Sequence, residues 1–99
     1  MYTNIDDIEG RIEIEPGDLH VASLEALKAI VDEHQYRYFT WPNDEPEDEP
    51  LLIDAFTASA MMKIYDALNL TNQERFRTRL AKSRVGFGIL VNFTWEHIG

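Results

Sequence analysis

The clearest periodic pattern of apolar residues lies between Pro50 and Asn69. Apolar side chains recur there at the spacing of one helix face, at Ile53, Phe56, Ala60, Ile64 and Leu68. Pro50 suits a first helical turn because its missing N–H needs no partner there, and Asn69 tolerates the left-handed conformation that ends a helix. The pattern predicts a helix over residues 50–69, in which Met61 and Met62 are expected to fill the core.

A second helix is predicted over residues 19–34. Asp18 stands before it as a candidate cap, and its apolar face is formed by Leu24, Leu27 and Val31. The outward-facing positions include the charged residues Glu25, Lys28, Asp32 and Glu33, so this helix is expected to lie on the surface with one buried face.

A third helix is predicted over residues 72–83. Thr71 and Glu74 have the spacing of a capping box, in which each side chain accepts a hydrogen bond from the other residue's backbone amide. Phe76 and Leu80 are the expected buried pair.

Two shorter segments have strand patterns. Residues 11–15 alternate apolar and charged side chains and are followed by Pro16 and Gly17. Residues 36–41 contain four aromatic residues, of which we expect at least two in the core. Because Pro42 follows at once, we expect this second segment at a sheet edge or strand end rather than in a central strand.

Residues 84–99 fit two patterns. Apolar and other residues alternate from 85 to 95, which is typical of a strand, whereas the same stretch also forms a helical stripe after Ser83 as a cap. We favour a helix packed antiparallel on the 50–69 helix, because that arrangement buries more apolar surface in a short chain. The side chains expected in the core in either case are Phe87, Val91 and Trp95.

These patterns together predict a mainly α (α-rich) single domain over residues 1–99, built from four to five packed helices. The alternative is an α+β fold with a minor sheet from residues 11–15, 36–41 and 85–95. At 99 residues the chain has room for one modest core and for no second domain.

The charge of the chain is unevenly distributed. The formal net charge is −9, with −12 in residues 1–54 and +3 in residues 55–99. Residues 43–50 contain five acidic residues, two prolines and no apolar side chain other than these prolines, which predicts a solvated loop. A field of this sign attracts basic partners and opposes approach to nucleic acid or to a membrane surface.

Catalytic chemistry has little support in the sequence. The chain has no cysteine, and His20, His34 and His97 are scattered without a second ligand at metal-binding spacing. No serine lies in a nucleophile turn, and Gly86 and Gly88 lack the context of a phosphate-binding loop. We therefore expect a protein that is not an enzyme and uses no metal or cofactor. Its apolar runs are shorter than a membrane span, so we expect a soluble, cytoplasmic protein.

Three groups of residues are candidates for binding. The first is an acidic surface whose carboxylates could imitate the phosphate charge of DNA, or could simply solubilise the chain; its members are Asp32, Glu33, Asp44, Glu45, Glu47, Asp48 and Glu49. The second is an aromatic patch of Tyr36, Tyr38 and Trp41, of residue types common in binding hot spots. The third is a basic stripe of Arg75, Arg79 and Lys82, which could contact phosphates. We favour the other interpretation, in which this stripe pairs with the acidic half of the chain, within one molecule or in a homodimer.

In size and acidity the chain resembles the small inhibitors that phages and other mobile elements use, including anti-CRISPR proteins and DNA mimics. The resemblance is compositional and rests on no motif. It implies a non-enzymatic inhibitor that occupies a basic surface of a nucleic-acid-handling protein. The alternatives are an oligomeric or structural adaptor that binds through the aromatic patch, and a small DNA-binding regulator that uses the basic helix.

Overall fold

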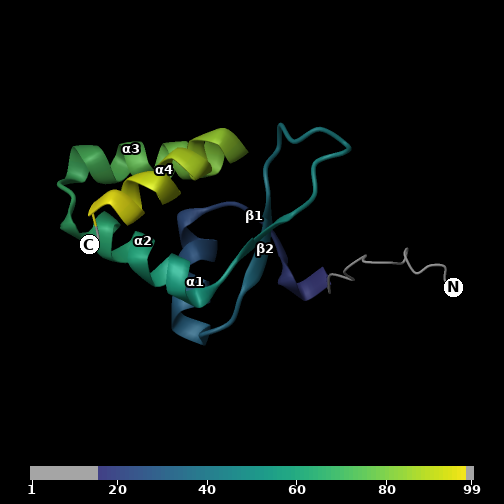
Figure 1. The fold of residues 1–99 in the computed structure, drawn as a ribbon, viewed down its shortest axis with the longest axis horizontal. Coiled ribbons are helices and arrows are strands. Elements are labelled where there is room, and N and C mark those ends of the chain that lie inside the picture. Colours follow the sequence, from purple (N-terminus) through teal and green to yellow (C-terminus); the bar gives the residue numbers. More distant parts are fainter. Residues whose placement is uncertain (1–15, 98–99) are drawn as a thin grey trace, which may run out of the picture.

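The computed structural model of the protein describes residues 16–97, in which four helices lie beside a three-stranded sheet (Figure 1). A single 3-10 turn, η1 (Pro16–Asp18), leads into strand β1 (Leu19–Val21). Strands β2 (Arg37–Thr40) and β3 (Leu51–Ile53) complete the sheet in the order β1-β2-β3. β2 pairs in parallel with β1 and antiparallel with β3.

The prediction of an extended segment at residues 36–41 is confirmed, but its expected edge position is wrong. β2 is the central strand, because Pro42 lies beyond its last residue and removes no N–H from either ladder. The predicted participation of residues 85–95 in this sheet is also wrong, and the predicted strand at 11–15 lies outside the described residues.

Helix α1 (Leu24–Glu33) begins five residues later than predicted. Ser23, and not Asp18, is its cap, since the Ser23 hydroxyl accepts a hydrogen bond of 3.0 Å from the backbone N–H of Ala26. The residues before Ser23 pair with β2 as β1, so sheet formation overrides the helical pattern there.

Helix α2 (Ala55–Ala67) is likewise shorter than predicted. Residues 51–53 pair with β2, and Asp54 caps the helix by accepting a hydrogen bond of 2.8 Å from the N–H of Thr57. Met61 is fully buried, as expected, whereas Phe56 is 74% exposed, so its predicted core position is wrong.

Helix α3 (Leu70–Lys82) buries Phe76 and Leu80, which confirms the predicted pair. Its cap is Asn69, whose side chain accepts a hydrogen bond of 2.9 Å from the N–H of Asn72. The predicted capping box at Thr71 is therefore wrong by two residues.

Residues 84–97 form helix α4 (Arg84–His97), which resolves the two competing patterns in favour of the helix. The Ser83 hydroxyl accepts a hydrogen bond from the N–H of Gly86, as expected of a cap. Phe87 is buried and Val91 is half-buried, but Trp95 is 40% exposed and its predicted burial is wrong. Trp95 instead stacks on the exposed Phe56 ring, at a centroid distance of 5.6 Å.

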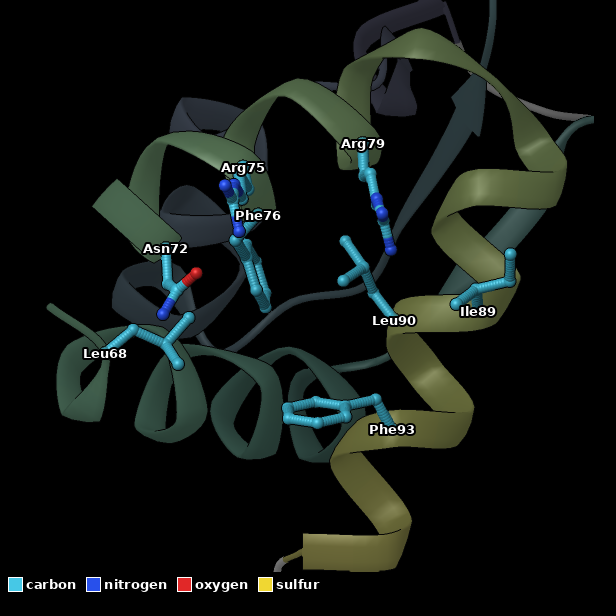
Figure 2. A pocket seen from close by; sticks show the side chains of 8 residues that line it. All are labelled: Leu68, Asn72, Arg75, Phe76, Arg79, Ile89, Leu90 and Phe93. Atoms are coloured by element: carbon cyan, nitrogen blue, oxygen red, sulfur yellow. The ribbon is translucent and has the colours of Figure 1, made fainter. Parts of the chain in front are cut away.

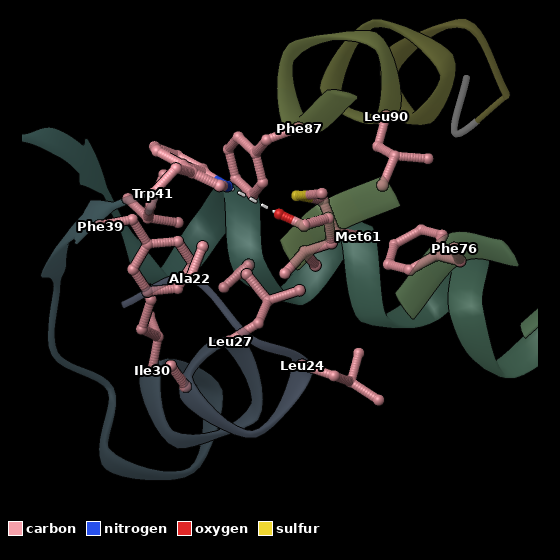
Figure 3. Packing of buried hydrophobic residues seen from close by; sticks show 14 residues of the cluster. Ala22, Leu24, Leu27, Ile30, Phe39, Trp41, Met61, Phe76, Phe87 and Leu90 are labelled. Carbon is pink, nitrogen blue, oxygen red and sulfur yellow. Dashed lines mark hydrogen bonds between the residues drawn. The ribbon is translucent and has the colours of Figure 1, made fainter. Parts of the chain in front are cut away.

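The core joins the sheet to the helices through three aromatic side chains (Figure 3). Phe39 and Trp41 come from β2 and the residue after it, and Phe87 comes from α4. Their ring centroids lie 5.4 to 6.2 Å apart. The indole Nε1 of Trp41 donates a buried hydrogen bond of 2.8 Å to the carbonyl of Leu80, in the last turn of α3.

The described residues thus form one compact, mainly α domain with a small mixed sheet, as predicted from the sequence. Of the helices within residues 16–97, none has the length and apolar character needed to cross a membrane.

Candidate functional site

Arg84 ties the acidic loop, residues 43–50, to the start of α4. Its guanidinium binds Asp44 through two contacts, Nη2 to Oδ2 at 2.9 Å and Nε to Oδ1 at 3.3 Å. The same Nη2 donates a hydrogen bond of 2.7 Å to the carbonyl of Glu49. The guanidinium also lies over the Trp41 ring, 5.2 Å from its centroid. Both ends of the loop are therefore held by one side chain.

Two hydrogen-bonded turns give the loop its internal shape. The Asp44 carboxylate accepts a hydrogen bond of 3.0 Å from the Trp41 N–H, and the Asp44 N–H donates one of 3.0 Å back to the Trp41 carbonyl. Asp48 and Glu45 repeat this exchange, at 2.8 and 2.9 Å. Short Asp side chains form such turns readily because they reach nearby backbone amides.

The hydrogen bond from Arg84 holds the pKa of the Asp44 carboxyl below its ordinary value, and the Trp41 amide acts in the same direction. A carboxyl with a lowered folded pKa stabilises the fold above its unfolded pKa, about 3.9. This contribution is lost as the pH falls through the folded pKa of Asp44, so the loop should loosen in acid.

Replacement of Arg84 with Gln is expected to raise the pKa of Asp44 towards or above its ordinary value, because the ion pair is lost and the carboxylate is largely buried. A carbon-detected NMR titration of the Asp44 carboxyl measures this directly. Arg77→Gln is the control, since Arg77 pairs with Glu25 at 2.7 Å and lowers the pKa of that residue. An unchanged pKa of Asp44 in the Arg84→Gln variant would contradict the attachment of the acidic loop to α4 through Arg84.

The structure divides the predicted acidic surface into separate parts. Asp44 is engaged by Arg84, and Glu33 pairs with Arg37 at 2.6 Å. The other members of the acidic surface are exposed and have no ion pair within residues 16–97. They are Asp32, Glu45, Glu47, Asp48 and Glu49. Asp32 and Glu33 end α1 near the start of β2, whereas the loop follows the other end of β2 (Figure 1). The structure does not bring these two groups together.

The predicted aromatic patch is wrong for Trp41, which is only 3% exposed because it packs between the sheet and α4. Tyr36 is half-exposed and meets Tyr38 edge to face, with ring centroids 5.8 Å apart. Tyr38 lies in register with Leu19 and Leu52, both exposed apolar residues of the outer sheet face. This row of Leu19, Tyr38 and Leu52 was not predicted from the sequence, since strand pairing fixes its register.

The predicted basic stripe lies on one exposed face of α3. Arg75, Arg79 and Lys82 form no ion pair within residues 16–97, so the predicted pairing with the acidic half is not seen for them in this part of the chain. Arg77 and Arg84 do make such pairs, with Glu25 and Asp44.

A pocket of about 330 Å³ opens beside this stripe, where α3 and α4 meet the end of α2 (Figure 2). Its apolar wall is formed by Leu68, Phe76, Ile89, Leu90 and Phe93. Its polar members are Asn72, Arg75 and Arg79, and Figure 2 shows the Arg79 side chain reaching from α3 towards Leu90. The two arginines were predicted from the sequence but the pocket was not, because its apolar wall depends on how the consecutive helices α2, α3 and α4 pack.

Acidic and histidine side chains within residues 16–97 do not gather into a group of three or more that could hold a metal ion. Comparison of the chain with protein-family models, with curated proteins and with solved structures finds no match.

Proposed function

We propose that this protein is a non-enzymatic binding protein that presents its acidic loop to a basic surface of a protein partner. The observation that carries the proposal is the double attachment of the loop by Arg84, through the Asp44 carboxylate and the Glu49 carbonyl. A loop held at both ends loses little further conformational entropy on binding, which favours affinity.

Charge supports the same proposal. Arg84 neutralises Asp44, but Glu45, Glu47, Asp48 and Glu49 are exposed and carry no ion pair within the described part of the chain. Four carboxylates in five residues attract cationic surfaces and accelerate association with them. The net charge of −9 adds a long-range field of the same sign.

Protein surfaces that bind nucleic acid are strongly basic, since DNA carries about one negative charge per 1.7 Å of helix axis. Exposed carboxylates on a loop whose two ends are held would compete for such a surface. The partner in this proposal is therefore a nucleic-acid-handling protein, and the effect of binding is inhibition by occupation of its phosphate-binding groove, in the manner of a DNA mimic.

The test is a matched pair of triple variants. Glu45→Gln/Glu47→Gln/Glu49→Gln removes three charges from the loop while keeping Asp44 and Asp48, whose carboxylates shape its turns. Asp66→Asn/Glu74→Gln/Glu96→Gln removes the same charge from exposed positions elsewhere. Each variant serves as bait in host lysate, and captured proteins are identified and then purified for affinity measurement.

We expect the loop variant to bind the captured partner about tenfold more weakly, because three exposed ion pairs at ~0.5 kcal/mol each sum to about 1.5 kcal/mol. The control variant should bind as the wild type does, and duplex DNA should displace the protein from its partner. Equal loss of binding in both variants would assign the effect to net charge alone. A partner that resists high salt and ignores the loop variant would overturn the proposal.

A further inference from the structure

The pocket between α3 and α4 combines an apolar wall with two guanidinium groups (Figure 2). We propose that it binds a small amphipathic carboxylate, an organic acid with one anionic head and a compact apolar body. This inference is independent of the acidic loop, because none of the residues that line the pocket belongs to that loop.

The two arginines place two positive charges at the edge of the pocket. Arg75 and Arg79 are one helical turn apart on α3, so their guanidinium groups share the same face. Two like charges at this spacing repel each other and destabilise the helix, and Lys82 adds a third positive charge three residues after Arg79. None of the three has an ion pair within residues 16–97. A bound carboxylate would relieve this repulsion and accept a bidentate hydrogen bond from either guanidinium.

The apolar wall supplies the other half of the site. Ile89 is 51% exposed and Phe93 is 37% exposed, although both face the pocket together with the buried Phe76 and Leu90. An apolar ligand body that covered these side chains would remove their surface from water, which favours binding. Neither half alone selects a ligand, but side by side they select an apolar molecule with an anionic end.

The size of the pocket limits the ligand. At about 330 Å³ it lies near the lower end of the ligand-pocket range, roughly 300–1,000 Å³. One short acyl or monoaromatic acid suits this volume, whereas a dinucleotide or a long lipid does not.

Protein-observed nitrogen–proton NMR titration with sodium octanoate tests the proposal. Two matched probes separate the contributions: 1-octanol keeps the apolar chain without the charge, and sodium butyrate keeps the charge with little chain. We expect saturable octanoate shifts centred on Asn72, Phe76 and Phe93. Binding of 1-octanol should be about tenfold weaker, the value of one charge-assisted hydrogen bond, and butyrate should cause no saturable shift.

The variant Arg75→Gln/Arg79→Gln keeps helix propensity and is expected to bind octanoate about tenfold more weakly while binding 1-octanol as before. Lys28→Gln/Lys63→Gln is the control, since it removes the same charge from exposed positions on α1 and α2. Equal affinity for octanoate and 1-octanol, equal losses in the two double variants, or no saturable octanoate shift in the low-millimolar range would each overturn the proposal.

Discussion

Replacement of Trp41 with Ala is expected to lower the free energy of unfolding by about 3–5 kcal/mol, as for other large buried aromatic residues. The indole is almost fully buried and packs against Phe39 and Phe87, so its removal leaves a cavity at the junction of sheet and helices. Typical domains have a stability of about 5–15 kcal/mol, so this variant would lie close to unfolding. Urea denaturation followed by circular dichroism measures the change.

Two further variants separate the causes. Trp41→Phe keeps an aromatic ring but removes the donor to the Leu80 carbonyl, and is expected to cost about 1–3 kcal/mol. Trp95→Ala removes the other tryptophan, which is exposed, and should cost less than about 1 kcal/mol. Similar losses for Trp41→Ala and Trp95→Ala would contradict the assignment of Trp41 to the core.

Substitution of Gly86 and of Gly88 with Ala is expected to change stability in opposite directions. A Cβ at Gly86 would lie 2.6 Å from the backbone carbonyl oxygen of Arg79, so α3 and α4 would have to move apart. Such overpacking costs about 1–3 kcal/mol, which exceeds the gain of ~1 kcal/mol from replacing a helical glycine. At Gly88 no atom lies within 4 Å of the added Cβ, so the gain of about 1 kcal/mol is kept.

Thermal unfolding of both glycine variants measures this difference in sign. Denaturant unfolding checks it, since a shifted midpoint with an unchanged denaturant dependence of the free energy reports a change in stability. Stabilisation of both variants by the same amount would show that α3 and α4 do not approach closely at Gly86. Because Gly86 sets the spacing of the two helices that form the pocket, octanoate binding by Gly86→Ala is an additional readout.

Local patterns predicted those elements whose stabilising contacts are near in sequence. Phe76 and Leu80 are one turn apart on α3, so their common burial followed from spacing alone. The starts of α1 and α2 were misplaced because the preceding residues pair with β2, and strand pairing leaves no local signal. Helix propensity at such positions is a weak prior that tertiary pairing overrides.

The candidate sites likewise combine features set by local spacing, which were predicted, with features set by contacts between elements, which were not. Arg75 and Arg79 were predicted to share a face from their spacing, whereas their apolar neighbours on α4 depend on how two helices pack. The expectation that at least two aromatic residues of 36–41 lie in the core is confirmed by Phe39 and Trp41, but Trp41 could not be singled out, since its hydrogen-bond partner Leu80 lies 39 residues away. The ion pair between Arg84 and Asp44 was not predictable for the same reason, since these residues are 40 apart in sequence.

Because Asp44 and Arg84 are 40 residues apart in sequence, they are synthesised at different times. The acidic loop leaves the ribosome well before Arg84, so the Asp44 carboxylate has no partner for its ion pair until that residue arrives. The turns closed by Asp44 and Asp48 involve residues three apart, whereas the attachment to Arg84 needs the start of α4 beside the loop. A chain that ends before Arg84 carries the full charge of the loop without its attachment to α4.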